Sequence, residues 1–333
     1  MDKILVEEYR GDILECVHRG HICGISDDGI KYSVGDMEFL TFFRSSAKPI
    51  QAIPIVKEGL YEKYGFTDRE LAVMTASHRA EPFHVEAIES IIVKLGINEE
   101  ALICLPTYPL GEAAKENLIR ENKSRRRIYH NCSGKHLGII TLCLGLGIDI
   151  GNYFEIGSAA QEEILNYISL MTEYPKENIK IGVDGCGVPV FAVPLKHLAK
   201  AYLKMACPDL IEDIEVRKAV EKITRVMNEN YEMVAGTDRI CSILLMDKNI
   251  VAKGGAKGVY CFALREERLG FAIKVMDGAE EQWPFIVISI LEQIGYKNKE
   301  TIKRLKESFP ADIKNDNKRV VGTNKTIFNM FEK

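Results

Sequence analysis

The sequence has no uncharged apolar run long enough to cross a bilayer. Its longest such run covers residues 137–148, whereas a membrane-spanning helix needs about 20 apolar residues. The first residues, MDKILVEEYRGDILE, place acidic side chains directly behind a short apolar run, which is not the pattern of a secretory signal. These two absences predict a cytoplasmic protein that has no membrane partner.

An excess of positive charge is also absent. The chain has 44 Lys and Arg residues against 48 Asp and Glu residues, which gives a formal net charge of −4. This balance indicates no general affinity for nucleic acid or anionic lipid. The one basic cluster, Lys123 with residues 125–127, is typical of a solvated loop. We therefore expect no nucleic-acid partner.

The cysteines do not have the spacing of a disulfide framework. There are nine of them, an odd number, scattered along the chain. In a reducing compartment they remain thiols, and most are expected to be buried as small apolar side chains. Only a cysteine that lies beside other metal-ligating residues points to a further role.

The order of short apolar runs predicts an α+β fold. The chain of 333 residues is long enough for a single domain, 1–333, with β-rich terminal parts, 1–43 and 236–333, and a mainly helical middle part, 44–235. The terminal strands are expected to share a mixed or antiparallel sheet. The predicted strands are ILVEEYR, LECVHRG, HICGIS, EFLTFF, IKIGV, CSILLM, NIVAKGG, VYCFAL and FAIKVM. The predicted helices cover residues 45–64, 83–95, 134–146, 208–226 and 284–296.

A serine and a lysine three residues apart, Ser45 and Lys48, stand at the predicted strand-to-helix junction. One helical turn separates them, so they lie on the same face. A serine hydroxyl is a weak nucleophile until a base removes its proton, and a buried lysine can be that base. A helix start also favours developing negative charge. The alternative is that Ser45 or Ser46 is a helix N-cap and Lys48 a surface residue.

Two further segments fit the same chemistry. Enzymes of the β-lactamase and penicillin-binding class pair an S-x-x-K nucleophile with a serine on the opposite wall and with a Lys-Thr-Gly strand. Ser77, in Thr-Ala-Ser-His, and Lys253, in Lys-Gly-Gly, can take these parts. The lysine segment lacks the middle hydroxyl, so the match is imperfect.

Two glycine-rich segments each combine a cysteine with polar residues. They are HNCSGKH, residues 130–136, and GVDGCGVP, residues 182–189. Two thiolates from separate loops, with a histidine or a neutral lysine between them, can bind zinc. By spacing alone, two buried structural cysteines remain the simpler interpretation. Asp184 in the second segment can hold a ligand amine or orient a metal ligand.

Six segments taken together resemble the rhizobial-type, zinc-containing L-asparaginases. The resemblance runs in one order from about residue 3 to about residue 325. It implies a serine-β-lactamase-like fold, a homodimer, and hydrolysis of L-asparagine to L-aspartate and ammonia. The segments are RSSAKPIQA (44–52), ASH (76–78), HNCSGKHLG (130–138), GVDGCGVPVFAVPL (182–195), AKGGAKGVY (252–260) and AIKVMDG (272–278).

The resemblance also implies a role for single residues. The catalytic pairs of the family fall on Ser45 with Lys48 and on Ser77 with Lys253. Its zinc ligands fall on Cys132, Lys135 and Cys186, and water completes the tetrahedron. Substrate contacts are expected from Asp184, Arg44 and His136.

The chain departs from the family pattern beside these positions. Arg79 and Ala80 replace Ser-Gly, Lys257 replaces a glutamate, and Met276 replaces another. Cys104 is followed by Leu-Pro-Thr, where the family has Cys-Gly-x-His. These changes leave the substrate open. They also leave two alternatives: a catalytically silent homologue that binds an amino acid or zinc, and a serine-lysine peptidase or esterase of the β-lactamase-like class.

Overall fold

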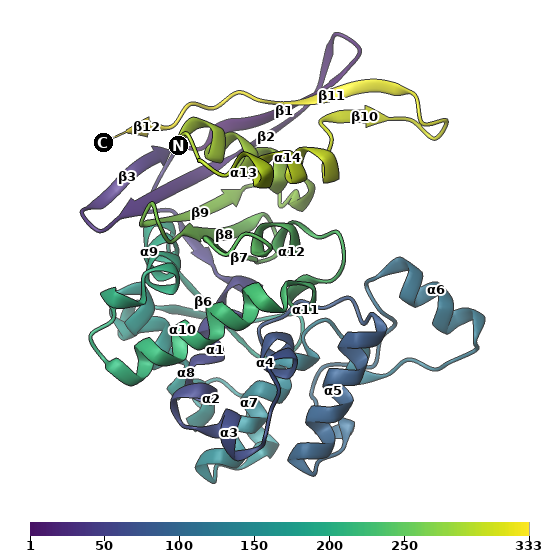
Figure 1. The fold of residues 1–333 in the computed structure, drawn as a ribbon, viewed down its shortest axis with the longest axis vertical. Helices are drawn as coiled ribbons and strands as arrows, with labels where there is room; N and C mark the ends of the chain where they lie inside the picture. Colours follow the sequence, from purple (N-terminus) through teal and green to yellow (C-terminus); the bar gives the residue numbers. More distant parts are fainter. Residues whose placement is uncertain (333) are drawn as a thin grey trace.

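Strands from both ends of the chain form one large sheet in the computed structural model, which describes residues 1–332 (Figure 1). Their order is β10-β11-β1-β2-β9-β8-β7, with β3 on β2 and β12 on β3. All of these pairs are antiparallel, so the predicted α+β fold with a shared terminal sheet is confirmed. The strands of this sheet are β1 (Lys3–Arg10), β2 (Ile13–Ser26), β3 (Gly29–Val34), β7 (Ile250–Gly254), β8 (Val259–Leu264), β9 (Leu269–Val275), β10 (Asp312–Lys314), β11 (Val320–Thr326) and β12 (Phe331–Glu332).

A second, smaller sheet lies within the helical part of the chain. It has the order β4-β6-β5 and is also antiparallel. Its strands are β4 (Leu40–Phe42), β5 (Lys180–Val183) and β6 (Pro189–Pro194). The turn that follows β4 and the loop between β5 and β6 carry Ser45 and Cys186, so this small sheet brings two of the predicted site segments together.

Helices cover both faces of the large sheet (Figure 1). Helix α9 packs on β2, β8 and β9, while α13 packs on β1 and β11. The helices are α1 (Lys48–Gln51), α2 (Ile53–Lys57), α3 (Leu60–Lys63), α4 (Asp68–Met74), α5 (Pro82–Leu95), α6 (Glu112–Arg120), α7 (Ser133–Leu146), α8 (Ala159–Thr172), α9 (Leu195–Ala206), α10 (Ile214–Glu229), α11 (Tyr231–Ala235), α12 (Ile240–Leu245), α13 (Trp283–Gln293) and α14 (Lys299–Ser308).

The sheet therefore separates two hydrophobic cores. Every residue of β7 and β8 is buried, as expected for strands that are covered on both faces. Cys261 and Ala272 belong to the core on the side of α9, whereas Phe262 and Phe271 belong to the core on the side of α13. This alternation follows from the two-residue repeat of a strand.

Some predicted elements differ from those observed. CSILLM is helical, in α12, because an apolar run of six residues fits a buried helical turn as well as a buried strand. LECVHRG and HICGIS are one continuous strand, β2, and do not form two. The predicted helix over 208–226 begins with a separate 3₁₀ turn, and α10 then starts after Asp213, whose side chain caps it.

The predicted helix over 45–64 is broken into a 3₁₀ turn and three short helices, α1 to α3. Neither serine caps it, because the Ser46 hydroxyl donates to the Phe43 carbonyl instead. The first break comes before Pro54, which lies at the start of α2 and lacks the N–H that would have continued α1. Within residues 1–332, no helix is both long and apolar enough to span a membrane.

Gly134 allows α7 to approach the backbone of α4 closely. A Cβ at this position would overlap the carbonyl oxygen of Val73. We expect Gly134→Ala to lower the free energy of unfolding by roughly 1–3 kcal/mol, because a backbone carbonyl cannot rotate away. Denaturant unfolding measures this change.

Gly138 provides the matched control in the same helix. A Cβ there comes close only to the flexible end of the Ile55 side chain, at 3.0 Å, and meets Met74 at an ordinary contact distance of 3.6 Å. Alanine also has the better helix propensity. Gly138→Ala is expected to leave the stability nearly unchanged. Equal stabilities of the two variants would contradict the close backbone approach at Gly134.

Candidate active site

Ser45 lies in a tight turn directly after β4. The turn is a 3₁₀ helix, Arg44–Ala47, and the Lys48 N–H donates to the Ser45 carbonyl. Residues three apart eclipse each other in a 3₁₀ helix, so Ser45 and Lys48 lie on the same face. Arg44 has a φ of 52°, a left-handed conformation that is costly for a residue with a side chain. Such local strain holds the serine turn in one shape.

The two adjacent serines have different surroundings. Ser46 is fully buried, its hydroxyl donates to the Phe43 carbonyl at 2.7 Å, and its own carbonyl accepts from the Tyr202 hydroxyl at 2.8 Å. The Ser45 hydroxyl forms no hydrogen bond with any of residues 1–332. Ser46 therefore stabilises the turn, while Ser45 keeps its hydroxyl available for a substrate.

The hydroxyl of Ser77 lies between two lysine amines. Lys48 Nζ is 3.1 Å and Lys253 Nζ is 3.0 Å from Ser77 Oγ. Lys48 also donates to the carbonyl of Ala76 at 2.6 Å, and Lys253 donates to the carbonyl of Gly254 at 2.8 Å. The structure thus brings three of the four predicted catalytic residues into direct contact, although they come from α1, the segment after α4, and β7.

Burial alters the acidity of both amines. Each lysine is 1% exposed, and neither forms an ion pair with a carboxylate of residues 1–332. Burial lowers the pKa of Lys48 and lowers the pKa of Lys253 to about 8. The positive charges of Lys48 and Arg79 act in the same direction on Lys253. Neutral amines that can accept a proton are therefore accessible near neutral pH.

Two thiols and a lysine lie together beside this centre. Lys135, in the first turn of α7, donates from Nζ to Cys186 Sγ at 3.0 Å. A hydrogen bond with Cys186, together with the charges of Lys48 and Lys135, holds the pKa of Cys132 well below its usual range. All three side chains are buried. Three residues from two distant segments thus converge at one point, as two glycine-rich loops allow.

The donor set fits a zinc ion. Soft thiolates and a neutral nitrogen are ligands that zinc prefers. The neighbouring thiols raise the pKa of Lys135, so a metal bound here would have to displace a proton from this amine. Within residues 1–332, no group of three His, Cys, Asp or Glu side chains is placed to hold a metal ion. A metal bound here would therefore need the amine of Lys135 as its third protein ligand.

The predicted substrate contacts fall into two groups. Arg44 and Asp184 form an ion pair of 2.8 Å between Nη2 and Oδ1, and the same carboxylate accepts from the Gly185 N–H. His136 is fully buried, and its Nδ1 is 2.7 Å from the hydroxyl of Tyr153. Its Nε2 is buried without a partner among residues 1–332. The ion pair is partly open to solvent, whereas His136 lies in the core.

Several contacts of the site have no signal in the sequence. The carbonyl of Ala76 is a backbone group, and any residue at position 76 would supply it. Tyr153 and Tyr202 hold His136 and the serine turn, but they lie far away in sequence, within helical or loop segments of ordinary composition. Only the fold shows these partners, because they depend on tertiary contacts and not on a local motif.

The residues that depart from the family pattern differ in how closely they are coupled to the catalytic candidates. Cys104 is buried, and burial raises the pKa of its thiol to about 12, which is the state of an inert structural cysteine. Lys257 is exposed, in the turn between β7 and β8, and Met276 is 40% exposed. Arg79 is only partly exposed and acts on Lys253. Arg79 is therefore the departure most closely coupled to the site.

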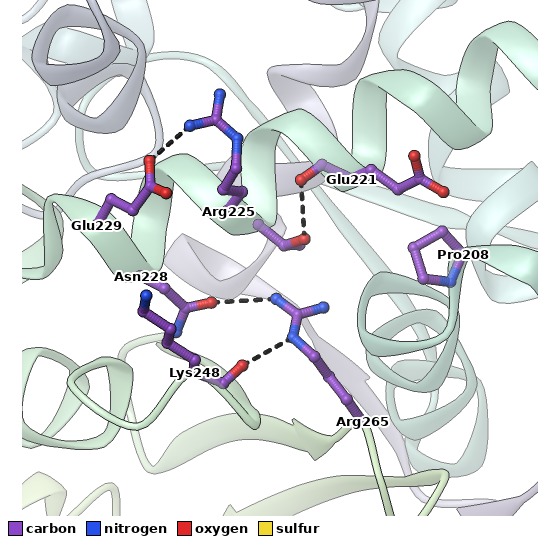
Figure 2. A pocket seen from close by; sticks show the side chains of 8 residues that line it. Pro208, Glu221, Arg225, Asn228, Glu229, Lys248 and Arg265 are labelled. Atoms are coloured by element: carbon purple, nitrogen blue, oxygen red, sulfur yellow. Dashed lines mark hydrogen bonds and ion pairs between the residues drawn. The ribbon is translucent and has the colours of Figure 1, made fainter.

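A cavity of about 260 Å³ lies elsewhere, beside α10 (Figure 2). Figure 2 shows the guanidinium of Arg265 directed at Asn228 and at the carbonyl of Lys248, with Arg225 directed at Glu229. These charged groups bind one another, and none of the predicted site residues lines the cavity. It is a separate surface feature and takes no part in the site.

Comparison with known proteins identifies the family. No curated protein matches the sequence significantly. Among solved structures, the chain is similar to a beta-lactamase from Mycobacterium bovis, with 12% identity over 82% of this chain and 94% of that one and a TM-score of 0.41. It is also similar to a class C beta-lactamase from Rhodobacter sphaeroides, with 13% identity over 87% and 93% and a TM-score of 0.39. The L-asparaginase II family matches residues 6–326, nearly the whole chain, and this protein belongs to that family.

Proposed function

We propose that the protein is an amidohydrolase that hydrolyses L-asparagine, or a related small amide, to L-aspartate and ammonia. Membership of the L-asparaginase II family supports this class of reaction. The observation that carries the proposal is the Ser77 hydroxyl, 3.0 and 3.1 Å from two buried lysine amines that have no carboxylate partner among residues 1–332. Such an arrangement can accept and return protons next to an available serine nucleophile.

The proposed cycle is an acyl transfer. Lys48 accepts the proton of the Ser45 hydroxyl, and Ser45 Oγ forms a bond to the amide carbon. The Ser45 N–H and a second donor hold the oxygen that becomes negative. The C–N bond then breaks, and the leaving nitrogen takes the proton that Lys48 accepted, which Ser77 and Lys253 pass on to it. Water hydrolyses the resulting ester and frees Ser45.

The Arg44–Asp184 pair and the zinc ligands have a different role in this cycle, which is to hold and orient the substrate. Cys132, Lys135 and Cys186 would hold the metal, which when bound supplies a fixed positive charge that can orient the substrate. Asp184 can bind the α-amino group of the amino acid, and Arg44 can bind its carboxylate. The existing ion pair keeps both side chains extended towards the same place until a substrate replaces it.

An ammonia-release panel across small amides tests the proposal. We expect turnover of at least one amide, with L-asparagine the first to be tried, and loss of this turnover in Ser45→Ala. Binding of asparagine by calorimetry without ammonia release would contradict an enzyme and favour a silent homologue. Covalent labelling by penicillin-like compounds, without ammonia release, would favour a serine-lysine peptidase or esterase.

Zinc content provides a second, independent test. Purified protein is expected to contain about one zinc ion per chain, because two thiolates and one amine, with water as the fourth ligand, make a tetrahedral zinc site. The Cys132→Ser/Cys186→Ser double variant should lose the metal. Because Lys135 must be neutral to bind zinc, occupancy is expected to fall as the pH is lowered. Elemental analysis after dialysis measures both effects.

Cys143→Ala is the matched control, since Cys143 is buried in the same helix as Lys135 but is not one of the three ligands. It should retain the zinc content of the parent protein. Equal zinc in the parent and in the double variant would remove the metal from this place.

A further inference from the structure

Arg79 projects from the same side of the chain as Ser77. Residues 76–81 lie outside any helix or strand, and buried and partly exposed residues alternate along them. Ala76, His78 and Ala80 face the interior, and the His78 ring lies 2.8 Å from the Ser133 hydroxyl. Ser77 and Arg79 are the partly exposed residues of this alternation, so they face the other side.

Two glycines make room for the arginine. A Cβ at Gly236 would lie 2.9 Å from Arg79 Cγ, and a Cβ at Gly111 would lie 3.2 Å from Arg79 Cβ. The stem of Arg79 therefore runs between two close backbone segments. This packing fixes the direction of the guanidinium. The charge of the guanidinium interacts with the charges of Lys253 and Arg239.

Neither guanidinium of this pair has a partner within residues 1–332. Within residues 1–332 the side chains of Arg79 and Arg239 form no hydrogen bond and no ion pair, and Arg79 Nε is buried without an acceptor. The nearest acids are engaged elsewhere. Glu81 accepts from the N–H and the hydroxyl of Thr237, and Glu280 accepts from the N–H of Lys257. The buried Nε of Arg79 is thus left without an acceptor, which a bound anion would supply.

We propose that Arg79 and Arg239 bind a carboxylate on the amine side of the scissile amide. The inference rests on the proposed function, because there Ser77 and Lys253 deliver the proton to the leaving nitrogen. Arg79 lies two residues beyond Ser77, at most about 7 Å along the chain. A carboxylate two bonds from that nitrogen is then within reach of the guanidinium. The substrate class is an amide formed with an amino acid.

The reaction of such a substrate is balanced without a further reactant. The bond from the acyl carbon to nitrogen breaks, and the acyl group passes to Ser45 and then to water. The leaving nitrogen takes one proton and departs as the amino group of a free amino acid. The carboxylate bound by Arg79 does not react, so it serves recognition only.

The test compares two substrates that differ only in one charge, β-aspartylglycine and β-aspartylglycinamide. We expect the parent protein to have the higher kcat/KM for the acid. In Arg79→Gln the ratio of the two values should fall by about tenfold or more, since a charge-assisted pair is lost. Arg79→Lys should restore part of the ratio, because it keeps the charge but not the planar fork.

Arg120→Gln, on the exposed helix α6, is the matched control and should leave the ratio unchanged. A parent protein that does not discriminate between the two substrates would overturn the inference, as would an unchanged ratio in Arg79→Gln. If asparagine is hydrolysed but the acid is not preferred, only this inference fails.

A binding measurement tests the carboxylate site even when no turnover is seen. In a Ser45→Ala background, calorimetry should show tighter binding of β-aspartylglycine than of β-aspartylglycinamide, and Arg79→Gln should remove the difference. If the parent protein hydrolyses neither asparagine nor these two compounds but this difference is found, the proposed function fails and the carboxylate site stands. If the difference is absent, the carboxylate site fails.

Discussion

Ser45→Ala is expected to reduce turnover by on the order of 10⁴-fold or more, the scale seen when a catalytic nucleophile is removed. Ser45 stands three residues before Lys48, in a 3₁₀ turn that places both on one face. Its hydroxyl has no hydrogen-bond partner within residues 1–332, so nothing in the protein competes with a substrate for it. Steady-state ammonia release, with zinc content checked, measures the effect.

Ser46→Ala is the matched control at the adjacent position. The Ser46 hydroxyl is buried and donates to the Phe43 carbonyl at 2.7 Å. The Ser46 N–H also donates to that carbonyl, at 3.2 Å, so the variant leaves the carbonyl with one donor. We expect a loss of stability of about 1 kcal/mol and retention of much of the turnover. The reverse ranking of the two variants would move the nucleophile to Ser46.

The sequence predicts the members of the site better than their contacts. The S-x-x-K spacing places Ser45 and Lys48 on one face, but it gives no sign that Lys48 Nζ is turned towards Ser77 and the Ala76 carbonyl. That arrangement arises because α1, the segment after α4, and β7 meet in the fold. Contacts between segments of distant sequence depend on packing, which no local pattern contains.

The secondary structure divides in the same way, into elements that a local sequence signal predicts and elements that depend on packing. Helix α5 ends before Gly96, with a φ of 63°, so its end is predictable from one residue that favours the left-handed conformation. The CSILLM segment has no such signal, and its helix, α12, follows from the space between β7 and α14. Arg79 is visible in the sequence as a departure from the family, but its unpaired guanidinium becomes evident only in the structure.

Hydrolysis is expected to increase with pH through about pH 8. Burial is the largest cause that lowers the pKa of Lys253 to about 8, against about 10.4 for a free lysine. Below that pH the ammonium form dominates, and it cannot accept a proton; above it the neutral amine dominates. Lys48 and Lys253 share the Ser77 hydroxyl, so the profile reports the pair and not one residue. The initial rate across pH measures it, with zinc occupancy checked at each point.

The folded state is not expected to be lost over this range. Between about pH 8 and 10.4, the unfolded chain keeps a proton on residue 253 that the folded chain has released, so this residue makes the stability rise with pH. Circular dichroism at each pH separates folding from catalysis. A rate that stays flat from mildly acid to strongly alkaline pH, with the metal bound, would mean that no lysine acts as the base.

Two charge variants identify which neighbour controls this profile. Arg79 lowers the pKa of Lys253, so Arg79→Gln removes a positive charge and should move the rising limb to higher pH. Lys257→Glu also makes the surroundings less positive and should move it in the same direction. Lys257 is exposed in a turn, however, where solvent and salt screen its charge, and its shift should be the smaller one. A larger shift for Lys257→Glu than for Arg79→Gln, measured with L-asparagine at one ionic strength, would mean that Lys257 faces the amines and that Arg79 is turned away from them.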